Sequence, residues 1–247
     1  MKTKFILLLS IVALLCSCSD DVVSEGVRSK TSRVQNLTFS FDSIEAPSNW
    51  ARYQTLEEML AACQIPEETL KAMTTEELIE VCMSHPLHAL YFAYNNELVG
   101  ANVIFEHFNG FTELSKRANA ADKMLGFYED VNCNVQSVNA HRKDFSVITY
   151  LGFIDLYIAS KKLNALYDAE HLQKLEQVSN RVLEKRLDQS PNDVYAIRRS
   201  LLINSQVKLT EGNLSQEEEN VLNSFIKVGG NADTPQAYTE VSAIVSK

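Results

Sequence analysis

Residues 168–209 read DAEHLQKLEQVSNRVLEKRLDQSPNDVYAIRRSLLINSQVKL, and this stretch decides the fold class. Apolar residues recur in it every three or four positions, which is the spacing of one face of an α-helix. The first predicted helix carries Leu172, Leu175, Val178, Val182 and Leu187 on this face, and the second carries Val194, Ile197, Leu201 and Leu209. Because Ser190-Pro191-Asn192 forms a tight turn between them, we expect the two helices to pack antiparallel.

Helix-start and helix-stop signals continue through the rest of the chain. Capping boxes, in which a hydroxyl and a glutamate satisfy each other's backbone donors, begin at Thr55, Thr74 and Ser215. Thr234-Pro235 is a further predicted start, and Gly229-Gly230 is a predicted stop. Segments with strand character are few. The sequence therefore predicts an all-α body of roughly eight to eleven helices over residues 49–247, forming a single domain that is either a bundle or an array of antiparallel helical hairpins.

Residues 147–159 are apolar on nearly every side, with interruptions at Thr149, Gly152 and Asp155. This pattern predicts a buried central helix. A membrane span is the competing interpretation, but the stretch is too short for a bilayer and ends in Lys161-Lys162.

The N-terminus has the order of a bacterial lipoprotein signal. Lys2 and Lys4 precede the apolar residues 5–15, and Leu15-Cys16-Ser17-Cys18 follows. The last four residues resemble a lipobox, with small Ser17 directly before the cysteine that would receive the lipid. We therefore expect residues 1–17 to be removed and Cys18 to carry acyl chains such as palmitate, of which two or more anchor a protein firmly.

Residues 18–48 are rich in Ser, Thr, Asp and Asn, and they predict a tether between the lipid and the helical body. Ser19-Asp20-Asp21 resembles the surface-export signal of Bacteroidetes lipoproteins, so an outer-membrane, surface-exposed location is expected. Within the tether, residues 37–41 alternate apolar and polar side chains, which predicts one short strand or an extended segment docked on the domain. Asp42-Ser43-Ile44 resembles a Bacteroidetes O-glycosylation motif, with Ser43 as the acceptor.

Charge limits the classes of partner. The 23 basic and 32 acidic residues give a net charge of -9, and removing Lys2 and Lys4 with the signal makes it -11. An acidic chain of this kind is not expected to bind nucleic acid, nor to be drawn to anionic headgroups. We expect contact with the membrane through the lipid alone, and another envelope protein is a candidate partner.

The sequence contains no catalytic constellation. Glycine-rich phosphate loops, Gly-x-Ser-x-Gly and zinc motifs are all missing, so we expect no catalytic residue, no cofactor and no resident metal. His85 and His88 are three residues apart, but Pro86 between them disfavours a shared helix face. A candidate ligand groove remains, formed by Tyr91, Tyr94, His88 and His107, against the alternative that its aromatics pack in the core.

Two further groups of residues have structural interpretations. Cys63, Cys82 and Cys133 remain after lipidation of Cys18, either as buried thiols or with Cys63 and Cys82 paired. The basic pairs Lys185-Arg186 and Arg198-Arg199 alternate with acidic residues, and we expect them on solvated faces.

Residues 70–130 resemble a group of uncharacterised lipoproteins from gut Bacteroidetes. The resemblance rests on Met73-Thr74-Thr75-Glu76-Glu77-Leu78, on Cys82 followed by Pro86-Leu87, and on Phe108-Asn109-Gly110-Phe111-Thr112-Glu113-Leu114 with Arg117 and Asn119-Ala120. It implies a lipoprotein and no particular activity. We read Phe108-Asn109-Gly110-Phe111 physically as the end of one helix and the start of the next, with Gly110 in a left-handed turn and Asn109 as a cap.

These observations favour a non-enzymatic, lipid-anchored outer-membrane protein that binds a ligand or another protein. A hydrolase acting on envelope material or glycan is the alternative, and it requires polar groups to converge around His85, His88 and His107. A structural subunit of an envelope complex is a third hypothesis.

Overall fold

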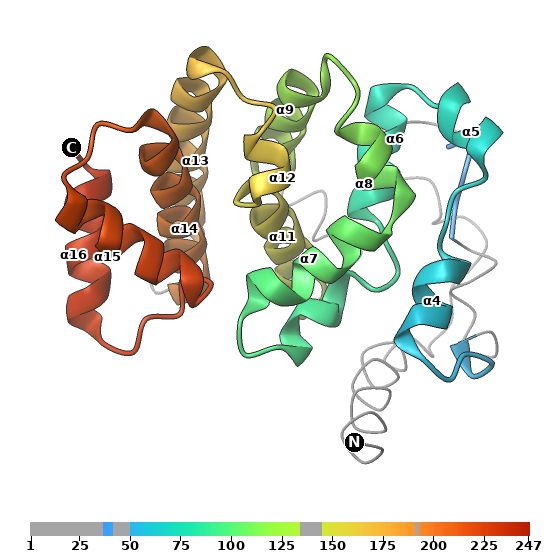
Figure 1. The fold of residues 1–247 in the computed structure, drawn as a ribbon, viewed down its shortest axis with the longest axis horizontal. Coiled ribbons are helices and arrows are strands. Elements are labelled where there is room, and N and C mark those ends of the chain that lie inside the picture. The colour runs from blue at the N-terminus through green and yellow to red at the C-terminus, as the bar shows by residue number, and fades with distance from the viewer. Residues whose placement is uncertain (1–36, 42–49, 134–144, 191–192) are drawn as a thin grey trace.

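A computed structural model describes residues 37–41, 50–133, 145–190 and 193–247. Its described residues are helical without strands, which confirms the all-α prediction (Figure 1). The elements are α4 (Leu56–Ala62), α5 (Glu67–Ala72), α6 (Thr75–Met83), the 3-10 helix η2 (His88–Ala93), α7 (Glu97–His107), α8 (Asn109–Leu114), α9 (Ala120–Cys133), α11 (Phe145–Ile158), α12 (Lys161–Asn164), α13 (Ala169–Gln189), α14 (Val194–Glu211), α15 (Gln216–Lys227) and α16 (Pro235–Val245). These exceed the predicted eight to eleven because several are short, down to the four residues of α12.

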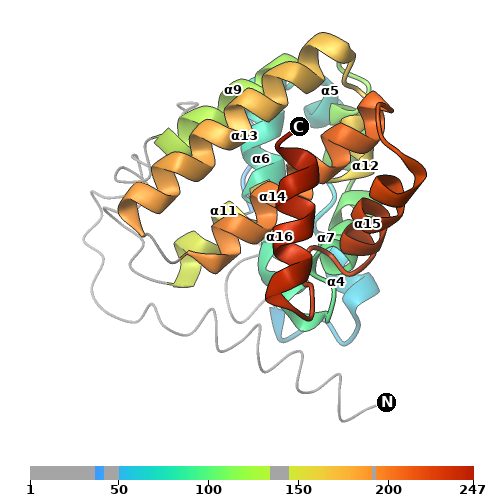
Figure 2. The same cartoon turned by 90° about the vertical axis from the view of Figure 1, so that its left-hand side faces the viewer.

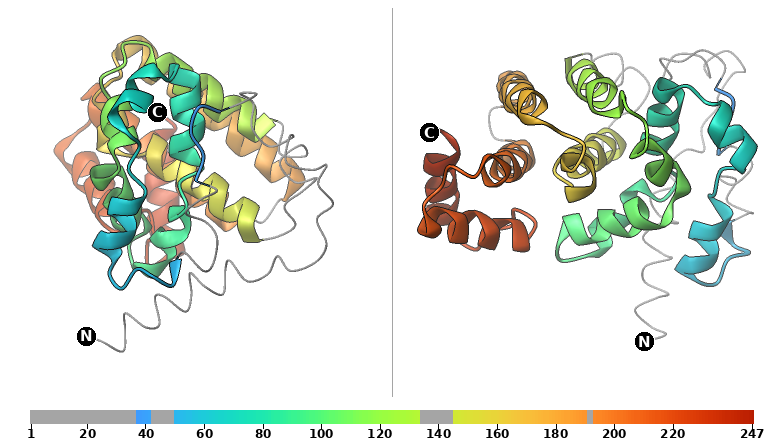
Figure 3. Two further views of the ribbon diagram at one scale, coloured as in Figure 1. Left: turned by 90° about the vertical axis from the view of Figure 1, so that its right-hand side faces the viewer. Right: turned by 45° about the horizontal axis from the view of Figure 1, so that its top comes forward.

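The helices follow one another along the longest axis of the molecule in nearly the order of the chain. In Figure 1, α4 and α5 lie at one end, α7, α9 and α11 lie in the middle, and α15 and α16 lie at the other end. The right-hand view of Figure 3 shows the same succession. This arrangement is closer to the array of hairpins than to a bundle around one axis.

The hairpin predicted from residues 168–209 is formed by α13 and α14, which lie side by side in Figure 2. Its polar contacts give the direction. The Ser179 and Ser200 hydroxyls are 3.2 Å apart, and the Lys208 ammonium lies 3.1 Å from Glu176. Going back along α13 from Ser179 to Glu176 corresponds to going forward along α14 from Ser200 to Lys208. The two helices are therefore antiparallel, as predicted.

Local sequence accounts for where helices begin and end. Thr74 and Ser215 form complete capping boxes with Glu77 and Glu218, as predicted. Thr234 caps α16, whose first residue is Pro235. The predicted stop after α15 also occurs, because Gly229 and Gly230 both adopt positive φ (64° and 76°) and the Gly230 amide donates to the Phe225 carbonyl.

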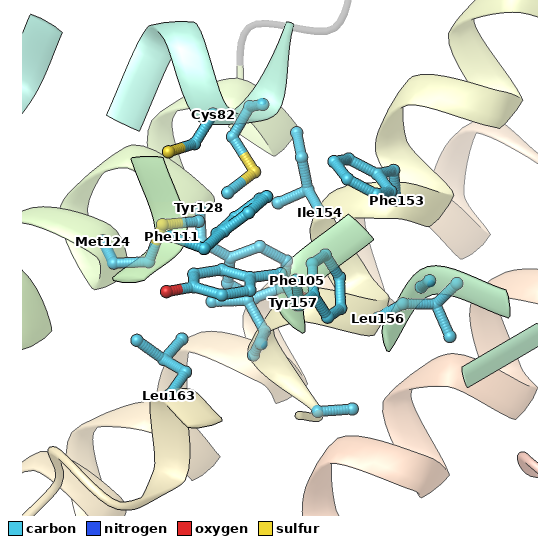
Figure 4. Close-up of a cluster of buried hydrophobic side chains, with 14 of the residues drawn as sticks. Cys82, Phe105, Phe111, Met124, Tyr128, Phe153, Ile154, Leu156, Tyr157 and Leu163 are labelled. Atoms are coloured by element: carbon cyan, nitrogen blue, oxygen red, sulfur yellow. The ribbon is translucent and has the colours of Figure 1, made fainter. Parts of the chain in front are cut away.

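The centre of the core is aromatic. The ring centroids of Phe105, Phe111 and Tyr157 lie 4.7–5.1 Å apart, and all three side chains are fully buried (Figure 4). They come from the consecutive helices α7 and α8 and from α11, about 30 residues further along the chain, so one cluster joins all three. The buried position of residues 153–159 confirms α11 as a central helix. Among the described helices, none has the length and apolar character needed to cross a bilayer.

The predicted alternation at residues 37–41 corresponds to a docked extended segment rather than a strand. Phe41 is buried, and its ring packs 5.6 Å from His85 and 6.0 Å from Phe108. The Thr38 hydroxyl donates to the Glu77 carboxylate over 2.9 Å. Period-two alternation suits any extended backbone with one buried face, so the pattern alone does not distinguish the two alternatives.

Phe41→Ala should release this segment while leaving the helical body folded. Removing a buried ring forfeits about 3 kcal/mol of packing, which is enough to undock a segment attached mainly through that ring. We expect faster amide hydrogen exchange in a peptide covering residues 37–41, with slow exchange retained in α7, α8 and α11. Phe39→Ala, at a half-buried position, is the control. Equal exchange in wild type and Phe41→Ala would contradict the role of Phe41.

Polar residues of the Phe-Asn-Gly stretch and its surroundings clamp neighbouring helices together. The Asn109 side chain donates to the Ile65 carbonyl and accepts from the Ile65 amide. Arg117 donates to the carbonyls of Leu70 and Met73 at the end of α5. These residues therefore have structural roles at the α5–α8 junction.

The expected left-handed turn at Gly110 is wrong. Gly110 lies inside α8, outside the positive-φ glycines of the described residues, and it is buried. A Cβ there would lie 2.8 Å from Phe108 Cζ and 3.0 Å from Cys82 Sγ. Glycine at position 110 thus permits close packing of α8 on α6, because any larger residue would displace Phe108.

Candidate functional site: a buried arginine cluster

The predicted ligand groove of Tyr91, Tyr94, His88 and His107 does not assemble. Tyr91 is fully buried, and its hydroxyl donates to the Thr149 carbonyl over 3.1 Å. Tyr94 lies just before α7, whereas His107 is the last residue of that helix, which separates them by the length of about eleven residues. His88 and His107 instead have their Nδ1 atoms against the carbonyls of His85 and Val103. His88, Tyr91 and Tyr94 are therefore close together, but Tyr91 is buried and His107 lies at the other end of α7, so the four residues do not line one groove.

The histidines that a hydrolase would require do not converge on a shared polar site, because His85 lies in aromatic packing and His88 and His107 face backbone carbonyls. His85 is buried between the rings of Phe41 and Phe108, with its Nδ1 accepting from the Leu87 amide over 3.2 Å. No group of three or more metal-ligating side chains occurs among the residues whose placement is described. The hypothesis of a histidine-centred site at residues 85, 88 and 107 is therefore not retained.

Burial lowers the pKa of His85 to about 3, with the nearby His88 acting in the same direction. The unfolded chain takes up this proton near the ordinary value of 6.5, so the unfolded state binds more protons between pH 6.5 and 3. The contribution of neutral His85 to stability is therefore complete above pH 6.5 and is lost as the pH falls towards 3. Urea unfolding of His85→Phe should show a weaker loss of stability over this window than wild type. Identical pH slopes would contradict the buried, neutral state of His85.

The remaining predicted sites are the cysteines and Ser43. Cys63 and Cys82 are both buried and no disulfide joins them, so the buried-thiol interpretation applies to them and the Cys63–Cys82 pairing is wrong. Burial raises the pKa of the Cys82 thiol well above its usual value. The Cys133 side chain, Cys18 and Ser43 lie outside the described part of the chain.

The arginines of the two basic pairs differ most from the sequence prediction. Arg186, Arg198 and Arg199 were expected on solvated faces, and that prediction is wrong. The Arg199 side chain is 3% exposed and those of Arg186 and Arg198 are each 10% exposed. The three guanidinium groups converge on the space between α7, α11, α13 and α14, where they meet two carboxylates.

Asp155 of α11 holds the inner half of this arrangement. Its carboxylate is completely buried and accepts two hydrogen bonds from Arg186, at 2.7 Å from Nη1 and 3.0 Å from Nη2. The same guanidinium donates to Asn132 Oδ1 through Nε and Nη2. Burial acts to lower the pKa of Arg186, but the charge and hydrogen bonds of Asp155, together with the effects of Tyr128 and Asp193, outweigh burial and raise the pKa. A two-point pair of this kind fixes α13 against α11 and α9.

Glu97, in the first turn of α7, holds the outer half. Its Oε2 pairs with the Arg198 guanidinium and lies 3.4 Å from Nη2 of Arg199. Arg199 Nη1 is also 3.9 Å from Asp155 Oδ2, so Arg199 bridges the two carboxylates. Each carboxylate is therefore shared between two guanidinium groups.

Tyr91 and Gly152 make room for Arg199. The Tyr91 hydroxyl accepts a hydrogen bond from Arg199 Nη2 over 3.3 Å, and burial raises the pKa of Tyr91 so that the phenol stays neutral. A Cβ at position 152 would collide with the Tyr91 hydroxyl and would lie 2.5 Å from Arg199 Nη2. The glycine that interrupts the apolar helix thus lets a guanidinium approach the α11 backbone.

The outer rim of the cluster is aromatic and exposed. The Tyr195 ring, 48% exposed, lies over both outer guanidinium groups, with Cζ of Arg198 at 5.2 Å and Cζ of Arg199 at 5.5 Å from its centroid. These distances are those of cation–π contacts. The adjacent Val194 is 63% exposed, the largest value among the exposed large apolar side chains of the described residues. We call Glu97, Tyr195, Arg198 and Arg199, together with the exposed Val194, the arginine rim.

One signal in the sequence was available for this cluster. A carboxylate inside a helix that is apolar on every side, as at Asp155, is stable only with a cationic partner. The partner's position was not available, because Arg186, Arg198 and Arg199 reach Asp155 through tertiary packing.

Searches of protein-family models, of curated proteins and of solved structures found no match to this chain.

Proposed function

We propose that this protein is a lipid-anchored protein of the bacterial outer membrane whose helical body binds another molecule without catalysing a reaction. The lipobox-like Leu15-Cys16-Ser17-Cys18 and the apolar residues before it support the anchor. The proposed surface exposure rests on Ser19-Asp20-Asp21 directly after the lipidated cysteine. The docked segment at residues 37–41 supports a defined junction between tether and body.

The observation that carries the binding role is the arginine rim. Large apolar side chains at Val194 and Tyr195 are exposed directly beside charged groups that are otherwise buried. A single exposed apolar residue needs no explanation, but an exposed aromatic ring over two buried guanidinium groups is the composition of an interaction centre. Arginine and tyrosine are both enriched among residues that dominate binding energies.

The experiment is a crosslinked pull-down of the intact lipoprotein from its own membranes, analysed by mass spectrometry. We expect metabolic labelling with an alkyne-bearing palmitate at Cys18 and a captured partner that is lost from Val194→Asp and Tyr195→Ala. The matched control is Val99→Asp, at an exposed position on α7 outside the rim.

Two results would contradict the proposal. Lack of label in wild type, with Cys18→Ser giving the same fractionation, would refute the lipid anchor. Saturable turnover of a substrate, abolished by a point substitution, would refute the non-enzymatic role. A stoichiometric partner that stays bound to the rim variants would move the interaction to another face, as expected for a structural subunit of an envelope complex.

A further inference from the structure

The arginine rim and the Arg186–Asp155 pair behind it together contain more guanidinium groups than carboxylates. Arg186, Arg198 and Arg199 face Glu97 and Asp155, which leaves one positive charge in excess. Asp193, which caps α14 by accepting from the Ala196 amide, keeps its negative charge and also acts on Arg186, so it offsets part of this excess. Tyr91 is neutral. The interior of the cluster is therefore electrostatically suited to one additional anion.

Hydrogen-bond donors remain for that anion. The Nε atoms of Arg198 and Arg199 are buried and have no hydrogen-bond partner among the described residues. Both arginines are more than nine-tenths buried, with residue exposures of 8% and 3%. Buried N–H groups of a guanidinium are rarely left without an acceptor, because the lost hydrogen bonds to water are not replaced.

We propose that the arginine rim binds an organic carboxylate, whose oxygens accept from Arg198 and Arg199 and whose apolar part packs on Tyr195 and Val194. This proposal rests on the binding role proposed above and gives its ligand a chemical class. A singly charged carboxylate is repelled less by Glu97 and Asp155 than a doubly charged phosphate would be. The planar fork of a guanidinium also matches the two oxygens of a carboxylate.

One exposed ring lies over both guanidinium groups. Tyr195 lies in the first turn of α14 and covers both guanidinium groups with one face, while nearly half of the residue is exposed. Rotation of an exposed side chain is fast and does not disturb the helix. The ring would then lie beside the ligand, where its apolar face adds contact area.

The turn after α15 lies against the arginine rim. A Cβ at Gly230 would lie 3.2 Å from Arg198 Cγ, so the end of α15 reaches the arginine stem. Val228, two residues earlier, is 43% exposed. The Asn96 side chain donates to the Lys227 carbonyl and thereby fixes this end of α15 to the start of α7. The turn after α15 is therefore held against the stem of Arg198, and the apolar side chains available to a short aliphatic chain are those of Val194 and Tyr195 on α14.

The test uses the full lipidated chain in detergent micelles and hexanoate as the probe. Nuclear magnetic resonance follows the Nε–Hε signals of Arg198 and Arg199, assigned through the variants below. We expect both signals to shift saturably with hexanoate. Hexanamide, which has the same shape without the charge, and sodium chloride at equal ionic strength should produce no saturable shift. Inorganic phosphate should bind more weakly than hexanoate.

Two rim variants should change the affinity in opposite directions. Arg198→Gln removes one donor and the excess charge, so it should weaken hexanoate binding by at least about tenfold. Glu97→Gln removes the carboxylate that competes for both guanidinium groups, so it should strengthen binding several-fold. A merely structural role of the cluster would not make Glu97→Gln bind more tightly. Arg181→Gln, which removes an exposed arginine paired with Glu129, is the matched control and should bind as wild type does.

Several outcomes would overturn the carboxylate site. These are the lack of a saturable shift, equal shifts with hexanamide or chloride, and tighter binding of phosphate than of hexanoate. Unchanged affinity in Glu97→Gln would overturn it as well, and this variant together with the wild-type titration decides the matter if Arg198→Gln does not fold. Failure here leaves lipid labelling and partner capture intact, so it is distinguishable from failure of the proposed function.

Discussion

Asp155→Ala should lower the free energy of unfolding by about 3–5 kcal/mol, the largest effect that we expect of any single substitution of a charged residue in this protein. The carboxylate is completely buried and pairs with Arg186 through two hydrogen bonds and with Arg199 at 3.9 Å. Its removal leaves two guanidinium groups in the interior without their shared anion. The loss would exceed that of an ordinary hydrogen bond because the orphaned charges are not hydrated.

Urea denaturation monitored by circular dichroism measures this loss. Asp122→Asn is the matched control, since Asp122 is an exposed acid 3.3 Å from Lys174, and such surface pairs contribute at most about 1 kcal/mol. The predicted order is a large loss for Asp155→Ala and a difference from wild type below about 1 kcal/mol for Asp122→Asn. Equal effects of the two substitutions would mean that the interior guanidinium groups find water or another acceptor.

Phe111→Ala should destabilise the protein to a similar degree, by about 3–5 kcal/mol. Phe111 is fully buried in the aromatic cluster, with its ring centroid 4.7 Å from Tyr157 and 4.9 Å from Phe105. The substitution removes a ring at the point where α7, α8 and α11 meet. The surrounding helices are held by other contacts and cannot collapse into the space, so a cavity remains.

Phe111→Leu separates volume from composition at the same site. Leucine keeps most of the apolar volume, and we expect a loss below about 2 kcal/mol, measured by the same denaturation curves. If alanine and leucine were equally harmful, ring stacking rather than cavity formation would dominate. If alanine were tolerated, α8 would not be part of the cooperative core.

Much of the fold could be predicted because its signals are local. The capping boxes at Thr74 and Ser215, the Thr234-Pro235 start and the glycine pair after α15 each depend on residues within one helical turn. The hairpin of α13 and α14 follows from apolar periodicity and a short connection. The apolar residues around 147–159 likewise predict burial, which is found over residues 152–159, whereas Ile148 in the first turns of α11 is 49% exposed.

The site could not be predicted in this way, because its contacts join residues far apart in the chain. An adjacent pair of arginines such as Arg198-Arg199 is typical of a solvated face, and only the docking of α7 and α11 converts these residues into interior groups. The predicted groove failed for a related reason. Tyr91 and Tyr94 are close in sequence, but the 3-10 turn of η2 sends Tyr91 into the core.

The docked segment at residues 37–41 also sets how far the helical body can travel from a membrane. If Cys18 carries the lipid, the 37 − 18 = 19 residues from the acyl group to Leu37 span at most about 65 Å at full extension. The docked residues 37–41 do not lengthen the tether, because Phe41 is buried in the core. The segment enters beside α6, whereas α13 and α14 lie further along the longest axis towards the C-terminal end (Figure 1). The distance of the helical body from the membrane surface would therefore not exceed the length of the tether plus the length of the body. A partner proposed for the arginine rim would have to come within this distance of the membrane to bind.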